Sequence, residues 1–256
     1  MSLNIETMQI LKSVLAGVIV ASAFIIGALI AIFRRYSVKN RAIFTAFGGG
    51  VFLATTAYLV QETLTIGNSW SLIVGFILGA ASYYSAKQLI KKNGQSKKKP
   101  ENNLNEPNPN NYPSGRLIII GTILDSVPEA LFVGIIIALN QLGVVAAVIV
   151  VFLGNLAATL EGTKRMKMRK IKNGDILKGW IADFLIVAAT APIGFYLAHI
   201  MTIDILATVL GFAAGTLIVF TSSELIAPAY RESMDQIEDI SISLGFLIGV
   251  ILLFIL

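Results

Sequence analysis

Eight long apolar segments, separated by short polar turns, constrain this chain more than any other feature of its sequence. A membrane-spanning helix needs about 20 consecutive apolar residues, and each segment is close to that length. Charged residues make up 14% of the chain, against about 25% in soluble domains. The pattern predicts an all-α, polytopic membrane protein with eight transmembrane helices and one domain over residues 1–256. The segments run roughly over 9–33, 42–62, 69–90, 116–139, 142–163, 176–199, 203–227 and 240–256.

The first segment is expected to remain in the protein as a helix. It has no basic stretch before it and no small-residue cleavage site after it, which distinguishes it from a signal peptide. The chain has no cysteine, which excludes disulfides and thiolate metal sites.

The basic residues predict how the helices are oriented, because loops rich in Lys and Arg stay on the cytoplasmic side of a membrane. With eight spans, all 20 Lys and Arg residues except Lys12 fall on one side. We therefore expect both termini outside and the basic loops in the cytoplasm, in a multi-pass protein of the cell membrane. The Lys and Arg residues that orient the helices also account for the pI of about 9.4. The positive charge therefore gives no reason to expect a nucleic-acid partner.

Two polar stretches lie on the predicted cytoplasmic side. Residues 93–115 are rich in Asn, Pro and Lys and are expected to form a disordered linker. Residues 164–172 are strongly basic and are predicted to be a solvated loop at the lipid headgroups. A role of this loop in binding anionic lipid or in regulation is the open alternative.

The fourth segment carries the clearest functional signal, because charged side chains inside a bilayer are costly and default to functional hypotheses. Asp125 and Glu129 are four residues apart, so they share one helical face about 6 Å apart along the axis. Pro128 removes a backbone hydrogen bond and frees a carbonyl nearby. An oxygen-rich face of this kind suits a divalent cation. The alternative is a protonated carboxyl group that hydrogen-bonds to a neighbouring helix.

Polar residues of three further segments lie at a similar predicted depth in the cytoplasmic half of the membrane. Asn155 lies in the fifth segment, Asp183 in the sixth, and Ser223 and Glu224 close to the inner end of the seventh. Together with Asp125 they predict a polar centre inside the helix bundle.

The remaining polar residues are expected in solvent-exposed, ion-paired or interfacial positions. Glu62 is expected to reach water at the outer end of its helix, with a role at an outer entrance as the alternative. Glu161 is expected to pair with Lys164 and Arg165, and His199 to lie at the outer interface. The acidic residues after the seventh segment are expected in a solvated loop, with weak cation capture as the alternative: Glu232, Asp235, Glu238 and Asp239.

Over its whole length the chain resembles the ZIP family of divalent-metal transporters. The resemblance lies in eight spans, outer termini and a variable polar loop between the third and fourth spans. FGGGVFLATTAYLVQET resembles the family's second helix, GFILGAASYYSAKQLI its third and GFAAGTLIVFTSSELIAPA its seventh. The most specific match is in the fourth, where the family's His-Asn-x-Pro-Glu-Gly corresponds to Asp125-Ser126-Val127-Pro128-Glu129-Ala130.

The resemblance implies a set of metal ligands. It places Asp125 and Glu129 at ligand positions, with Ser126 beside them and Glu224 as a further candidate. An aspartate stands where the family has a histidine, and the linker contains no histidine. Sites built only from oxygen favour harder ions such as Mn²⁺, Fe²⁺ or Mg²⁺.

The fifth segment departs from the family pattern at one position. Asn155 fits a ligand position, but the family's next acidic or histidine residue falls on Ala158. Glu161, one turn further on nearly the same face, is the candidate carboxylate closer to the cytoplasm.

The predicted function is transport of Zn²⁺ or a harder ion (Mn²⁺, Fe²⁺) towards the cytoplasm, without enzymatic activity and without a cofactor. The resemblance implies alternating access around a site near the middle of the membrane. A transport-inactive sensor or scaffold is one alternative, suggested by Ala158 and the missing histidines. An intramembrane aspartyl enzyme using Asp125 and Asp183 is another, although no span contains Gly-x-Gly-Asp.

Glycine-rich faces at 47–50, 75–80 and 211–215 allow close helix contact. They permit a homodimer without proving one.

Overall fold

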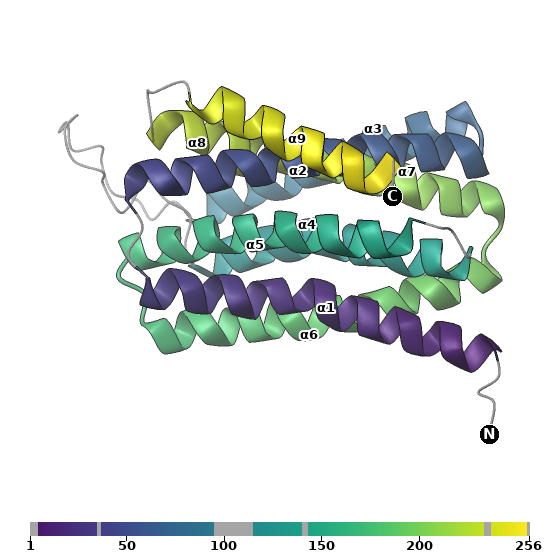
Figure 1. The fold of residues 1–256 in the computed structure, drawn as a ribbon, viewed down its shortest axis with the longest axis horizontal. Helices are drawn as coiled ribbons and strands as arrows, with labels where there is room; N and C mark the ends of the chain where they lie inside the picture. The colour runs from purple at the N-terminus through teal and green to yellow at the C-terminus, as the bar shows by residue number, and fades with distance from the viewer. Residues whose placement is uncertain (1–4, 35–36, 95–114, 140–142, 233–236, 255–256) are drawn as a thin grey trace.

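The computed structural model is a bundle of long helices that run along one common axis (Figure 1). It describes residues 5–34, 37–94, 115–139, 143–232 and 237–254, and these contain no strand. The predicted linker lies almost wholly outside the described residues. The helices are α1 (Ile5–Phe33), α2 (Val38–Ile66), α3 (Ser69–Gly94), α4 (Gly115–Ala138), α5 (Val144–Met168), α6 (Asn173–Ile200), α7 (Ile203–Phe220), the π-helix η2 (Thr221–Ile226), α8 (Ala227–Glu232) and α9 (Ile237–Phe254).

Among the described residues, which are almost entirely helical, seven stretches of helix are long and apolar enough to cross a membrane, as expected of a multi-pass membrane protein. One of them runs through α7, η2 and α8 without interruption. The segment at 69–90 also forms a helix, α3, but does not reach the same apolarity over its described residues. Its C-terminal half carries tyrosine, serine and lysine side chains among its apolar residues.

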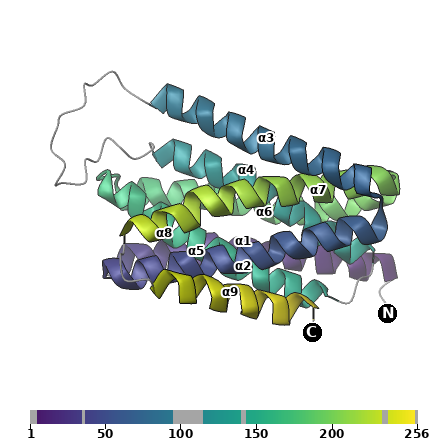
Figure 2. The same cartoon turned by 90° about the horizontal axis from the view of Figure 1, so that it is seen from above.

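The described Lys and Arg residues other than Lys12 lie at one end of the bundle, which is called the basic end here. The last turn of α1, the first turn of α2 and the whole of α8 lie there, at the left of Figure 1. The first turn of α1 and the last turn of α9 point to the opposite end (Figures 1 and 2). At the basic end, Lys167 donates to the backbone oxygens of Ala31 and Ile32, at 3.4 and 2.9 Å, and Ser37 caps α2 by accepting from the Asn40 N–H at 3.1 Å.

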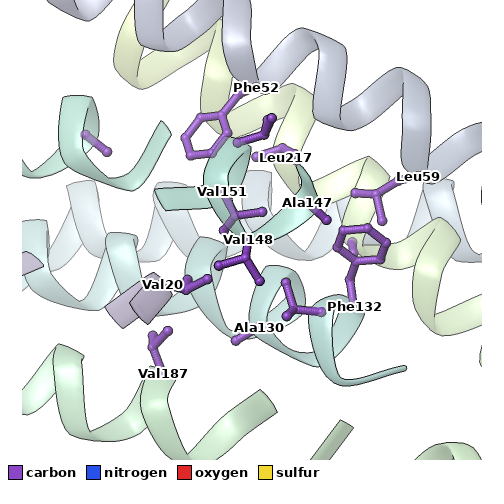
Figure 3. Close-up of a cluster of buried hydrophobic side chains, with 14 of the residues drawn as sticks. Val20, Phe52, Leu59, Ala130, Phe132, Ala147, Val148, Val151, Val187 and Leu217 are labelled. Atoms are coloured by element: carbon purple, nitrogen blue, oxygen red, sulfur yellow. The ribbon is translucent and has the colours of Figure 1, made fainter. Parts of the chain in front are cut away.

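Helices α2, α4 and α5 are mostly buried, whereas less than half of α6 and of α9 is buried. The apolar centre of the bundle is formed around α5, where Val148 and Val151 lie between Phe52 and Leu217 on one side and Val20 on the other (Figure 3). Because the lipid-facing residues of α6 and α9 are also apolar, the bundle is apolar both inside and outside. Polar groups in its interior therefore stand out.

Glycines bring α3 and α7 into backbone contact, as the glycine-rich motifs predict. A Cβ atom at Gly79 would overlap the backbone oxygen of Phe212, and one at Gly215 would overlap that of Phe76. Gly50 approaches the backbone oxygen of Ile242 on α9 equally closely. Small residues allow this approach between helices in a membrane.

Replacing Gly215 with valine is expected to force α3 and α7 apart and to destabilise the protein by about 1–3 kcal/mol, the usual range for overpacking. Gly121→Val is the matched control, because a Cβ atom at Gly121 meets nothing within 4 Å. Both variants replace a helical glycine with valine, so the change in intrinsic helix propensity is the same in both. Thermal unfolding of both variants in detergent measures the difference. Equal melting temperatures would contradict the close contact.

The structure corrects two expectations about the basic end. Residues 164–168 are helical and belong to α5, so the basic stretch is a loop only from Arg169 onwards. Glu238, expected in a solvated loop, is fully buried in the first turn of α9.

Candidate metal centre

Four polar side chains from three helices lie fully buried in the bundle and are called the deep polar cluster here. Asp125 and Glu129 come from α4, Asn155 from α5 and Asp183 from α6, and each side chain has no exposed surface. Asp125 lies within electrostatic range of both Glu129 and Asp183, and the Asn155 amide lies beside Glu129. The structure thus brings together four of the seven candidates.

The local sequence explains how α4 presents its two carboxylates. They are one helical turn apart, and α4 packs most extensively against α6, which supplies Asp183. Pro128 lies inside α4 without ending the helix. Ser126 is buried beside Asp125, and its hydroxyl donates to the Thr122 backbone oxygen at 2.8 Å. That hydroxyl oxygen can still accept a hydrogen bond or bind a cation.

The deep polar cluster lacks internal hydrogen bonds. Both oxygens of Asp125, Glu129 and Asp183 and both polar side-chain atoms of Asn155 have no hydrogen-bond partner among the described residues. Asn155 is close to Glu129 but does not reach hydrogen-bond geometry. An uncompensated buried carboxylate costs several kcal/mol. Three such carboxylates on adjacent helices therefore need bound protons or a bound cation to compensate their negative charge.

The carboxylates line the interior but do not form a complete coordination shell. In the part of the chain that the structure describes, no three side chains of His, Cys, Asp or Glu converge closely enough to hold a metal ion. A bound cation would need additional oxygen ligands, such as the Asn155 amide, the Ser126 hydroxyl, a backbone carbonyl or water.

The other two candidates, Glu161 and Glu224, lie in a separate layer nearer the basic end. Glu161 accepts from the Arg165 Nε at 2.8 Å and lies 3.4 Å from the Arg41 Nε. Glu224 accepts from the Arg165 Nη1 at 2.6 Å and from the Lys87 ammonium at 2.7 Å. Both carboxylates are therefore neutralised by basic side chains in this conformation.

Arg165 is the main residue of this layer that the sequence did not single out as a candidate. The signal was present, because Glu161 and Arg165 are four residues apart and so face each other on a helix. The expected pairing of Glu161 with Arg165 is therefore confirmed, although residues 164–168 were expected in a loop. The other partner of Arg165, Glu224, is recognisable only in three dimensions, since 59 residues separate them.

Of the two polar residues expected towards the opposite end, only Glu62 is less exposed than expected. Glu62 is only 7% exposed and lies beside Tyr58, so it does not simply reach water. His199 is exposed in the last turn of α6, its Nδ1 lies 2.8 Å from the Phe195 backbone oxygen, and its ring contacts the Phe195 ring.

A cavity of about 230 Å³ between α3, α4 and α7 has an almost entirely apolar lining and contains none of the acidic residues. It is therefore separate from the deep polar cluster. Its lining residues are Ser82, Tyr83, Ile123, Leu124, Val127, Pro128, Phe212 and Thr216.

The sequence matches no protein-family model and no curated protein.

Proposed function

We propose that this protein transports divalent cations across the membrane in the manner of the ZIP family. The observation that supports the proposal most strongly is the deep polar cluster: three fully buried carboxylates and one amide, from three helices, without hydrogen-bond partners among the described residues. Such groups are expensive to keep in an apolar bundle. A passing cation that they bind in place of its water explains their presence.

The proposed topology has eight spans with both termini outside. Helix α3 is the eighth span, and its 26 residues extend over about 39 Å, enough to cross a bilayer. The basic end then faces the cytoplasm. The cation reaches the deep polar cluster from the outside and leaves past Glu161 and Glu224 towards the basic end.

Asp125 and Glu129 are proposed to bind the cation directly, and Asn155 and Ser126 to supply neutral oxygens. Asp183 faces Asp125 from α6 and adds a third negative charge. Because every donor is oxygen, the site favours Mn²⁺, Fe²⁺ or Mg²⁺ over softer ions, with Zn²⁺ as a borderline substrate.

Uptake by purified protein in proteoliposomes tests this function. Saturable accumulation of at least one ion from a panel of Mn²⁺, Fe²⁺, Zn²⁺ and Mg²⁺, above that in protein-free vesicles, is the expected result. No accumulation of any ion, with correctly folded protein, would refute the proposal.

Acidic medium is expected to slow this uptake, because carboxylates must be deprotonated to bind a cation. Lowering the pH on the uptake side protonates the deep polar cluster and raises the metal concentration needed for half-maximal uptake. Initial rates measured across a range of pH at constant ionic strength test this. A rate that rises steadily as the medium is acidified would contradict it.

A transport-inactive sensor or scaffold is the second candidate function. It is favoured by the absence, among the described side chains, of any three acidic or histidine groups that converge on one point. Direct binding of Zn²⁺, Mn²⁺ and Fe²⁺ to detergent-solubilised protein separates the candidates. No saturable binding favours the scaffold, whereas binding with uptake supports the transporter.

A further inference from the structure

Arg165 ties two helical elements together at the basic end. Its Nε donates to Glu161 on α5 at 2.8 Å, its Nη1 to the Glu224 carboxylate on η2 at 2.6 Å, and its Nη2 to the Glu224 backbone oxygen at 2.9 Å. All three nitrogens of the guanidinium group are used. This geometry needs arginine, since a lysine ammonium cannot donate along these three directions at once.

Two further basic residues extend the ionic layer to other helices. Lys87 connects α3 to Glu224 at 2.7 Å, and Arg41 connects α2 to Glu161 at 3.4 Å. Four elements, α2, α3, α5 and η2, therefore meet through one ionic layer made of Arg41, Lys87, Glu161, Arg165 and Glu224, which we call the basic-end layer.

The basic-end layer lies between the deep polar cluster and the basic end. Along α5, Glu161 is six residues and Arg165 ten residues beyond Asn155, or about 9 and 15 Å nearer the basic end. Exposure rises outwards through the layer, from 5% for Glu161 and 11% for Arg165 to 39% for Lys87. Tyr83 lies within electrostatic range of both Glu224 and Asp125, so the two polar layers are neighbours.

The π-helix that carries Glu224 also carries polar groups without hydrogen-bond partners among the described residues. The hydroxyls of Thr221 and Ser223, on the same π-helix as Glu224, have no hydrogen-bond partner among the described residues. π-Helical turns are uncommon and occur frequently at functional sites. Stability alone does not explain the basic-end layer, because a buried ion pair rarely stabilises a protein more than apolar side chains of similar volume do.

We propose that Arg165 is the closing residue of a gate between the deep polar cluster and the basic end. In the closed state, its guanidinium occupies the place between Glu161 and Glu224 that a departing cation would take. Opening requires Arg165 to leave both carboxylates, which frees an exit lined by Glu161, Glu224 and the η2 hydroxyls. The inference rests on the proposed transport function, since a gate has meaning only along a pathway.

Cysteine accessibility tests the gate without relying on transport. The chain has no cysteine, so Ala158→Cys introduces a single thiol. Ala158 is buried and lies on the α5 face between Asn155 and Arg165. A membrane-impermeant methanethiosulfonate reagent is added to the basic-end side of sealed vesicles, and its labelling rate is compared with and without Arg165→Gln.

We expect Arg165→Gln to speed labelling of Ala158→Cys from the basic-end side by about tenfold or more, because several hydrogen bonds from a charged group are lost. Arg165→Lys is expected to give a smaller increase, and Lys178→Gln, which changes an exposed basic residue at the same end, none. Gly174→Cys, on the exposed first turn of α6, reports that the reagent reaches this side equally in every background. Should Arg165→Gln fail to fold, Arg165→Lys carries the same comparison.

Equal labelling with and without Arg165, or an equal increase from the opposite side, would overturn the gate. Metal uptake by the same vesicles separates this result from failure of the proposed function. Faster labelling without uptake of any metal counts against transport and supports closure by Arg165, whereas uptake without a change in labelling counts against the gate alone.

Discussion

Replacing Asp125 and Glu129 together with alanine is expected to reduce saturable metal uptake by about 100-fold or more. Substitutions that only support a metal ligand already lower metal affinity or activity about 10–100-fold, and these two carboxylates are proposed as the ligands themselves. Initial uptake rates of Mn²⁺, Fe²⁺ and Zn²⁺ into proteoliposomes give the measurement. Uptake equal to that of the wild-type protein would rule out the deep polar cluster as the transport site.

A matched control separates this loss from a general effect of removing negative charge. Asp175→Asn neutralises an exposed carboxylate in the first turn of α6, outside the deep polar cluster, and is expected to leave uptake unchanged. The isosteric variants Asp125→Asn and Glu129→Gln are expected to lose uptake while unfolding at the same or a higher temperature, because each removes an uncompensated buried acid. Loss of uptake accompanied by lower stability would indicate a structural role instead.

Replacing Glu161 with glutamine is expected to destabilise the protein by about 3–5 kcal/mol, the range for removing one partner of a buried ion pair. The Glu161 carboxylate lies within 2.8 Å of the Arg165 guanidinium and within 3.4 Å of that of Arg41, and both basic side chains are largely buried. Without Glu161, two guanidinium groups face each other with less compensating charge. Thermal and denaturant unfolding in detergent measure the loss.

The double variant Glu161→Gln, Arg165→Gln is expected to lose less stability than the sum of the two single losses, because both substitutions remove the same Glu161–Arg165 contact. The exposed pair Asp175–Lys178, 3.9 Å apart, is the control, and Asp175→Asn is expected to change stability by less than about 1 kcal/mol. Additive effects of the two substitutions in the basic-end layer would contradict direct coupling between Glu161 and Arg165.

Much of the fold was predictable because hydropathy is a local property. Each of the eight apolar segments forms a helix, with only Leu139 and Gly143 at segment ends in turns, and the predicted segment 176–199 corresponds to α6 within a few residues. The pairing of Asp125 with Glu129 was equally predictable, since one helical turn separates them regardless of what surrounds α4. The glycine motifs predicted close helix contacts, although the sequence could not say that α3 meets α7 and α2 meets α9.

Errors arose where a residue's environment depends on neighbouring helices. Residues 164–168 were predicted as a solvated loop because their lysines and arginine resemble headgroup-facing residues. Arg165 is instead turned inwards, because two acidic side chains compensate its charge in the interior. Glu238 was assigned to solvent for the same reason, since the sequence alone does not show that the first turn of α9 is covered by its neighbours.

The sequence by itself determined that the chain is apolar and helical, that its basic residues gather at one end, and that acidic residues lie inside the spans. These properties depend on composition and on the helical repeat, which act over a few turns. Only the tertiary structure decided how the acidic residues divide into two layers. Asp125, Glu129 and Asp183 lack compensating partners among the described residues, whereas Glu161 and Glu224 are paired with Arg165. Electrostatic compensation in an apolar interior depends on contacts between helices far apart in the sequence, so it is decided only when the bundle assembles.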